Sequence, residues 1–204
     1  MKPSRAKRPV FLDRDGTLIV EKRYLSDPDE VTLEHTVIEG LTLLHEKGHP
    51  LIVVSNQSGV GRGKFTEADA YRVNVRADEL LRRSGIEMLA WYICPHAPDI
   101  ACSCRKPLPG MPLAASQEWG VHLPGSYVIG DKRADLELAD AIGGIGILVT
   151  TGHGLGDLSW ALTQGRPTFD LFRDAARYVC EIEAHADPVT ACESATMPKS
   201  WNSQ

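Results

Sequence analysis

Short apolar runs alternate along most of this chain with longer segments in which apolar residues recur at helical spacing. The strand-like runs cover residues 9–12, 51–55, 88–93, 126–129 and 145–149. The helical segments cover residues 37–47, 66–84, 111–119, 134–142 and 169–184. The run at 51–55 is apolar almost throughout, as in a strand buried on both faces. This alternation predicts an α/β fold with a doubly wound, Rossmann-like parallel sheet covered by helices on both faces.

The domain organisation predicted from this pattern is simple. The sequence shows no internal repeat, and its 204 residues suffice for one core of ordinary size. We therefore expect residues 1–185 to form a single domain, interrupted by a Pro- and Cys-rich loop at 94–110. Residues 186–204 lack periodicity and are expected to form a flexible tail.

Composition narrows the class of protein. Hydrophobic residues make up 43% and charged residues 24% of the chain, which is typical of a soluble globular protein. The net charge of -5 and the pI near 5.8 argue against nucleic acid as a partner. No apolar stretch has the length of a membrane span or signal peptide. These features predict a cytoplasmic protein without a membrane partner.

Two aspartates follow the first predicted strand. Asp13 and Asp15 are two residues apart, so an extended strand end places both carboxylates on one side, and Gly16 lets the backbone turn away. Such a pair holds a hard cation such as Mg²⁺, and one carboxylate can attack phosphorus to form an aspartyl-phosphate. The alternative is an ordinary turn, for which Asp and Gly are also suited.

Other strand ends carry groups that phosphoryl transfer requires. Ser55 and the polar residues to Gly59 follow the second strand, and Gly130, Asp131 and Lys132 follow the strand at 126–129. Arg105 and Lys106 supply positive charge between them. Each group alone is typical of a cap, a turn or a solvated side chain. Their succession on strand ends predicts one site at the carboxyl edge of the sheet.

Four potential soft-metal ligands fall within eleven residues: Cys94, His96, Cys102 and Cys104. Three thiolates and one imidazole form a known structural zinc set, which is closed and tetrahedral. The alternative is buried thiols beside a loop histidine. The loop leads directly into Arg105 and Lys106, so a zinc ion would position these cations. No role is assigned to Cys180 or Cys192.

The motifs together resemble the haloacid dehalogenase superfamily over residues 9–152, beginning with Asp-Arg-Asp-Gly-Thr at 13–17. The resemblance implies that Asp13 is the nucleophile and Asp15 the general acid and base. It further implies that Ser55 binds the phosphoryl group and that Lys106 orients Asp13. Mg²⁺ would lie between Asp13, the Asp15 carbonyl and Asp131, with Asp135 next to these ligands.

The metal loop is similar to that of the histidinol-phosphatase-like branch, whose members have little cap. This resemblance also implies that the protein is a monomer. Residues 56–65 and the Pro-Gly-Met at 109–111 favour the branch members that remove the 7-phosphate of D-glycero-D-manno-heptose 1,7-bisphosphate in lipopolysaccharide precursor synthesis. The residues that this resemblance and their place in the motifs assign to substrate binding are Glu21, Tyr24, Asn56, Gln57, Ser58, Arg105 and Lys132.

Several features keep alternatives open. Five residues separate His96 from Cys102, as in histidinol-phosphate phosphatases, and Glu21 stands where the branch usually has Asp. A polynucleotide phosphatase is disfavoured by the acidic pI. A catalytically silent zinc module that binds a partner would lack some of the four residues Asp13, Asp15, Lys106 and Asp131, all present here. Histidines other than His96 are expected at the surface or in the core.

Overall fold

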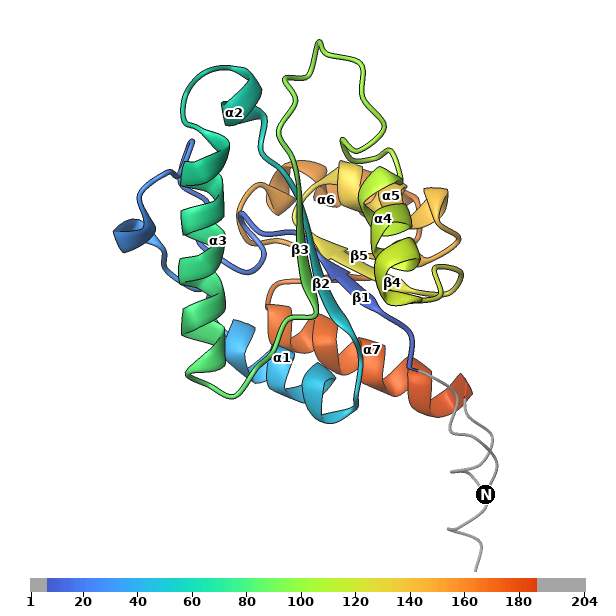
Figure 1. Ribbon diagram of the computed structural model, residues 1–204. Coiled ribbons are helices and arrows are strands. Elements are labelled where there is room, and N and C mark those ends of the chain that lie inside the picture. Colours follow the sequence, from blue (N-terminus) through green and yellow to red (C-terminus); the bar gives the residue numbers. More distant parts are fainter. Residues whose placement is uncertain (1–6, 187–204) are drawn as a thin grey trace, which may run out of the picture.

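The computed structural model describes residues 7–186, which form a six-stranded parallel sheet between layers of helices (Figure 1). The strand order is β3-β2-β1-β4-β5-β6. The strands are β1 (Val10–Leu12), β2 (Leu51–Asn56), β3 (Ala90–Cys94), β4 (Tyr127–Gly130), β5 (Ile145–Val149) and β6 (Thr168–Phe169). The predicted Rossmann-like sheet is confirmed.

Helices cover both faces of the sheet because side chains alternate along each strand. Val10 and Leu12 of β1 point into one core, with helices α1 (Val37–Glu46), α3 (Glu67–Arg82) and α7 (Phe172–Ala186). Phe11 points into the opposite core. Helices α4 (Gly110–Trp119) and α5 (Arg133–Ala141) cover that face, and α6 (Gly154–Thr163) packs beside α5.

The strand order places a crossover beside β1, where a ligand-binding site can form. β1 lies between β2 and β4, and the chain crosses from edge strand β3 to the other side of β1 before it forms β4. The Asp13 N–H donates to the carbonyl of Ile129, which extends the β1–β4 ladder to the strand ends. Ligands bind at such a crossover, outside the carboxyl ends of the strands.

The sequence pattern missed two elements after β5. Helix α6 buries only Gly154 and Ala161, while Leu155 and Leu162 are largely exposed, so it has no apolar stripe to recognise. Strand β6 has two residues, and Phe169 pairs with Val149 there. The last helix therefore begins at Phe172 rather than at 169. The predicted tail at 186–204 lies almost wholly outside the described residues.

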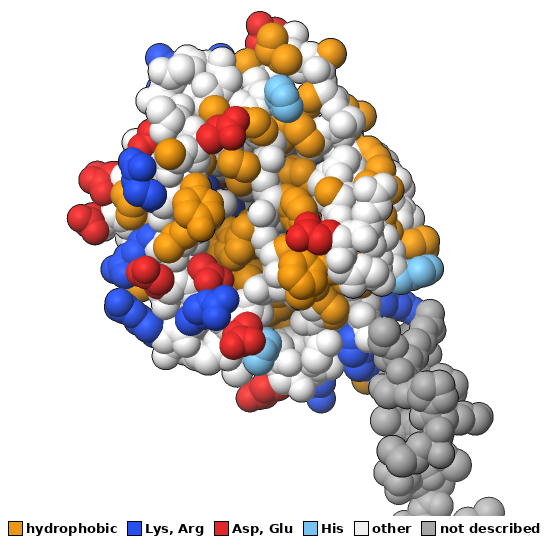
Figure 2. Space-filling view, in the orientation of Figure 1, with side chains coloured by type: hydrophobic (Ala, Val, Ile, Leu, Met, Phe, Trp, Pro, Cys, Tyr) orange, Lys and Arg blue, Asp and Glu red, His pale blue; other side chains and the backbone are white. Residues whose placement is uncertain are grey.

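The surface on the side of α3 and β3 mixes charges of both signs with hydrophobic side chains (Figure 2). Ion pairs join neighbouring side chains on α3, including Asp78 to Arg82 at 2.6 Å, so positive charge there is largely compensated. Within residues 7–186, no helix combines the length and the apolar character that a bilayer crossing requires.

Candidate active site and metal centres

The end of β1 presents the two predicted aspartates at the edge of one pocket. Asp13 is almost completely buried, whereas Asp15 is half-buried, and both line the same cavity. Gly16 follows with φ of +82°, and a Cβ on this residue would collide with the carboxylate of Asp131. The glycine is therefore required both for the turn and for the close approach of β1 to the residue after β4.

Three buried carboxylates gather at this edge: those of Asp13, Asp131 and Asp135. Each offers an oxygen within 4.8 Å of the others. Among the described residues, Asp131 Oδ1 accepts no hydrogen bond and has the Lys132 ammonium as its ion-pair partner, at 3.3 Å. Burial and the charge of Asp13 raise the pKa of Asp131 to about 8. A buried, incompletely compensated oxygen cluster suits a hard divalent cation such as Mg²⁺.

Lys106 is the cation that compensates this cluster from the protein side. Its buried Nζ lies 2.6 Å from Asp13 Oδ1 and 2.6 Å from Asp135 Oδ1. Burial acts to lower the pKa of Lys106, but the two carboxylates outweigh it and raise that pKa. Burial likewise acts to raise the pKa of Asp13, which Lys106 and Lys132 reverse. Asp13 is thus held as a carboxylate, as a nucleophile requires.

Asn56 fixes the backbone of Lys106. Its amide Nδ2 donates to the Lys106 carbonyl at 3.2 Å, and its Oδ1 accepts from the Lys106 N–H at 2.9 Å. β2 thereby positions the lysine that arrives from the loop after β3. Asn56 was predicted to bind substrate; both ends of its amide are engaged with Lys106.

Gln57 and Ser55 support the second aspartate. The Gln57 amide donates to Asp15 Oδ2 at 2.7 Å and to Ser55 Oγ at 2.8 Å, and Gln57 is itself buried. In the structure, therefore, the side chain of Gln57 binds the carboxylate of Asp15. Contact of Gln57 with substrate stays a prediction, while Ser55 and Ser58 both line the pocket, as expected for groups that bind phosphate oxygens.

The pocket above these groups has a volume of about 510 Å³. All predicted catalytic and substrate-binding side chains line it, together with others from four regions of the chain. Its wall comprises Asp13, Arg14, Asp15, residues 21–25, residues 55–59, Phe65, Arg105, Lys106, Lys132, Ala134, Asp135 and His153. The structure thus brings together groups that are more than a hundred positions apart in sequence.

The mouth of the pocket combines charges of both signs. Glu21 lies 3.7 Å from Lys132 and 3.8 Å from the imidazole of His153. Tyr24, with φ of +60°, exposes 38% of its surface there. His153 was expected at the surface or in the core, and sequence spacing gave no signal for its place here. Its backbone N–H also donates to Asp131 Oδ2 at 2.8 Å.

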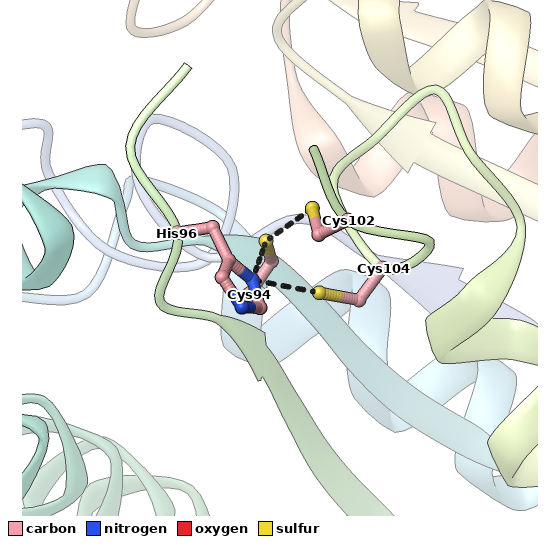
Figure 3. A group of neighbouring side chains, drawn as sticks. All are labelled: Cys94, His96, Cys102 and Cys104. Carbon is pink, nitrogen blue, oxygen red and sulfur yellow. Dashed lines mark hydrogen bonds between the residues drawn. The ribbon is translucent and has the colours of Figure 1, made fainter. Parts of the chain in front are cut away.

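The four predicted soft ligands converge at the end of β3 (Figure 3). His96 Nδ1 lies 3.3 Å from Cys104 Sγ and 3.5 Å from Cys94 Sγ, and Cys94 Sγ lies 3.8 Å from Cys102 Sγ. Burial and the two neighbouring thiols raise the pKa of Cys104 to about 12. Thiols crowded in this way become thiolates when a cation binds them, so the cluster fits a metal ion.

The thiol cluster is tied to the pocket through the backbone. Arg105 Nη1 donates to the carbonyl of His96 at 3.3 Å, and the Gly61 N–H donates to the carbonyl of Pro95 at 2.8 Å. The loop therefore holds Arg105 beside the pocket and packs against α2 (Ser58–Gly61). The loop thus holds Arg105, whereas Asn56 holds Lys106; that a zinc ion positions both cations stays a prediction.

A family description of HAD-hydrolase-like proteins matches residues 103–176 of this chain. The chain is 40% identical over 151 residues to D-glycero-beta-D-manno-heptose-1,7-bisphosphate 7-phosphatase of Yersinia pestis, covering 70% of this chain and 80% of that protein. It is 34% identical over 186 residues to the Vibrio cholerae protein of the same name, covering 87% of this chain and 99% of that one.

A solved structure agrees with these relatives. D,D-heptose 1,7-bisphosphate phosphatase from B. bronchiseptica, in complex with magnesium and phosphate, superposes with a TM-score of 0.78 at 30% identity. The match covers 85% of this chain and 98% of that one. The expected superfamily and the expectation of a phosphatase are both confirmed. This chain belongs to the HAD-like phosphatase family that includes the D-glycero-beta-D-manno-heptose-1,7-bisphosphate 7-phosphatases.

Proposed function

We propose that this protein hydrolyses the 7-phosphate of D-glycero-D-manno-heptose 1,7-bisphosphate through an aspartyl-phosphate on Asp13. The observation that carries the chemistry is Lys106, which lies 2.6 Å from Asp13 and holds this carboxylate ionised at the base of the pocket. An anionic nucleophile approaches an anionic phosphate only where cations offset the repulsion. The names of the relatives support the choice of substrate.

Two half-reactions follow from this arrangement. In the first, a carboxylate oxygen of Asp13 bonds to phosphorus, the phosphorus–oxygen bond to the sugar breaks, and Asp15 gives a proton to the leaving oxygen. In the second, water attacks phosphorus, the bond to Asp13 breaks, and Asp15 takes the proton from water. Ser55 binds the phosphoryl oxygens, and Lys106 keeps Asp13 oriented.

Magnesium is the metal that suits the carboxylate cluster. Asp13, Asp131 and the Asp15 backbone carbonyl would hold it, and Asp135 lies beside them. When bound, Mg²⁺ offsets the negative charge of the phosphoryl group. The three neighbouring carboxylates support this assignment, as do Asp131 Oδ1, which accepts no hydrogen bond from the described residues, and the magnesium in the similar solved structure.

Zinc is the metal that we propose for the four-ligand cluster. Three sulfur atoms and one imidazole nitrogen fill a tetrahedral site, so this ion would shape the loop and take no part in the chemistry. The free cysteines Cys94, Cys102 and Cys104 are consistent with metal ligation rather than disulfide bonding.

Substrate recognition falls to the mouth of the pocket. We assign it to Glu21, Tyr24, Ser58, Arg105 and Lys132, whose hydroxyl, carboxylate and cationic groups face a cavity of about 510 Å³. Asn56 and Gln57, which were also predicted to bind substrate, contribute by positioning Lys106 and Asp15. We further predict that the enzyme is monomeric and cytoplasmic, that residues 1–185 form one domain, and that it has no nucleic acid partner.

Phosphate release from purified protein with Mg²⁺ tests the proposal. Heptose 1,7-bisphosphate, as the β anomer that the relatives' names specify, is compared with the α anomer and with histidinol phosphate. ³¹P NMR of the product identifies which phosphate is lost, and Asp13→Asn serves as the blank. Release of the 7-phosphate only, absent in the blank, is expected. Preference for histidinol phosphate would overturn the substrate and keep the chemistry.

A further inference from the structure

Arg14 is the largest fully buried side chain in the described part of the chain, and the mechanism above gives it no role. Its guanidinium grips the neighbouring Asp15 carboxylate: Nε donates to Oδ2 at 3.1 Å and Nη2 to Oδ1 at 3.0 Å. Burying a guanidinium is costly unless it is paired and hydrogen-bonded. Among the described residues, Asp15 is its ion-pair partner.

The third contact of Arg14 comes from a different layer of the molecule. Nη1 donates to Oδ1 of Asn74 at 2.8 Å, and Asn74 lies on α3. The buried face of this helix otherwise carries Ala70, Val73, Ala77 and Leu81, so Asn74 is its one polar member. A buried amide on an apolar helix face needs a hydrogen-bond partner, and Arg14 is that partner.

The Asp15 carboxylate is therefore held by donors on two sides. Arg14 contacts both oxygens, and the Gln57 amide donates to Oδ2 at 2.7 Å. The side chain of Asp15 still exposes 16% of its surface and lines the pocket. Its orientation is fixed from behind while one side faces the space in which a substrate would lie.

We propose that Arg14, anchored by Asn74 of α3, is the positioning residue for the acid–base step of Asp15. This inference rests on the proposed function, in which Asp15 protonates the leaving oxygen and later deprotonates water. A proton transfer requires the heavy atoms to lie about 3 Å apart, and small misplacements lower the rate strongly. A bidentate guanidinium fixes a carboxylate in a plane, which a single hydrogen bond does not.

The competing explanation is that Arg14 and Asn74 only dock α3 onto the sheet. The two explanations differ in how they treat the leaving group. The p-nitrophenolate anion leaves without a proton, whereas a sugar alkoxide needs one from Asp15. A docking defect would lower the activity on both substrates alike. A misplaced Asp15 would leave formation of the aspartyl-phosphate from p-nitrophenyl phosphate unchanged but would slow the hydrolysis of that intermediate.

Asn74→Ala is the principal variant, and Val73→Ala is its matched control, since Val73 is buried on the same helix and makes no polar contact there. We expect Asn74→Ala to lower kcat for the sugar bisphosphate by roughly 10- to 100-fold with little change in KM. With p-nitrophenyl phosphate it should give a burst of one p-nitrophenolate per enzyme, followed by slow turnover. Val73→Ala should show no such burst.

Two further variants guard against a folding defect. Asn74→Asp retains the acceptor oxygen and should restore much of the activity, while Arg14→Lys keeps the charge but loses the bidentate contact and should resemble Asn74→Ala. Equal losses on both substrates without a burst, or a loss of thermal stability alone, would overturn the inference. An inactive wild-type protein, or an active Asp13→Asn variant, would instead overturn the proposed function.

Discussion

The two clusters of potential metal ligands are built in opposite ways. Cys94, His96, Cys102 and Cys104 come from one strand end and the loop after it, and the cluster is held by neighbours in sequence (Figure 3). The carboxylate of Asp13 follows β1, that of Asp131 follows β4, and that of Asp135 lies on the first turn of α5, so the cluster joins separate halves of the chain.

The two clusters also differ in burial and in the charge around them. All three carboxylates are buried among charged groups, with Lys106 inserted between Asp13 and Asp135. In the sulfur cluster only Cys94 is fully buried, and its four protein ligands would fill every position of a tetrahedral metal ion. A cluster of three carboxylates leaves positions on a hard cation for substrate. The carboxylate cluster is therefore suited to chemistry, and the sulfur cluster to shaping the loop.

The largest effect is expected from Asp13→Asn. The variant loses the nucleophile, so phosphatase activity should fall on the order of 10⁴-fold or more. The zinc that we propose for the cysteine cluster, measured by elemental analysis, should remain at one ion per chain. Activity within tenfold of the wild type would show that another group attacks phosphorus.

Cys104→Ser should break the other cluster. We expect loss of the bound zinc and a fall in the free energy of unfolding of roughly 3 kcal/mol, measured by urea titration, because the loop loses its cross-link. The matched control is Cys180→Ser, a half-buried thiol on α7 outside the cluster. If Cys104→Ser kept the metal and the stability, the cluster would not be a structural metal site.

Asp135→Asn tests whether the carboxylate site depends on residues beside the reacting ones. Lys106 would lose one of its two ion pairs, so kcat should fall about 10- to 100-fold while the zinc content stays constant. The control is Asp140→Asn, also on α5, whose carboxylate pairs with Arg166 at the surface. Equal kinetic effects of the two variants would remove the distinction.

The smallest effect is expected far from both clusters, at the amino end of β2. Burial lowers the pKa of His49, whose Nδ1 contacts the Arg8 carbonyl and whose charged neighbours are Glu183, Lys7 and Arg8. The unfolded chain protonates this imidazole near pH 6.5, so unfolding takes up a proton below that pH. The free energy of unfolding should therefore decrease as pH falls through 6.5.

His49→Gln removes that titration. Urea unfolding at pH 7.5 and pH 5.5 should show a smaller decrease for the variant than for the wild type. Activity and both metal contents at pH 7.5 should be unchanged, because the side chain lies at the opposite end of the sheet. Parallel pH profiles of stability for the two proteins would contradict the assignment.

Much of the architecture was predictable because its signals are local. Thr66 marks the start of the helix at 67–82, because it is the N-cap residue and forms a capping box with Asp69. The run at 51–55 indicated a strand buried on both faces, and β2 is buried there throughout. Helix α6 was missed since it lies at the edge of the sheet and buries little, so no periodic stripe was selected.

The sequence pattern predicted the strands β1 to β5 with most of the helices between them, the two aspartates after β1 and the four soft ligands. Each of these depends on spacing within a few residues, which periodicity and ligand chemistry record directly. Three features came from the tertiary structure alone: Asp131 is buried and its Oδ1 accepts no hydrogen bond from the described residues, Asn56 holds Lys106, and Asn74 accepts a hydrogen bond from Arg14. Those features depend on contacts between residues far apart in the chain, and the energy of a buried charge depends on surroundings that only folding creates.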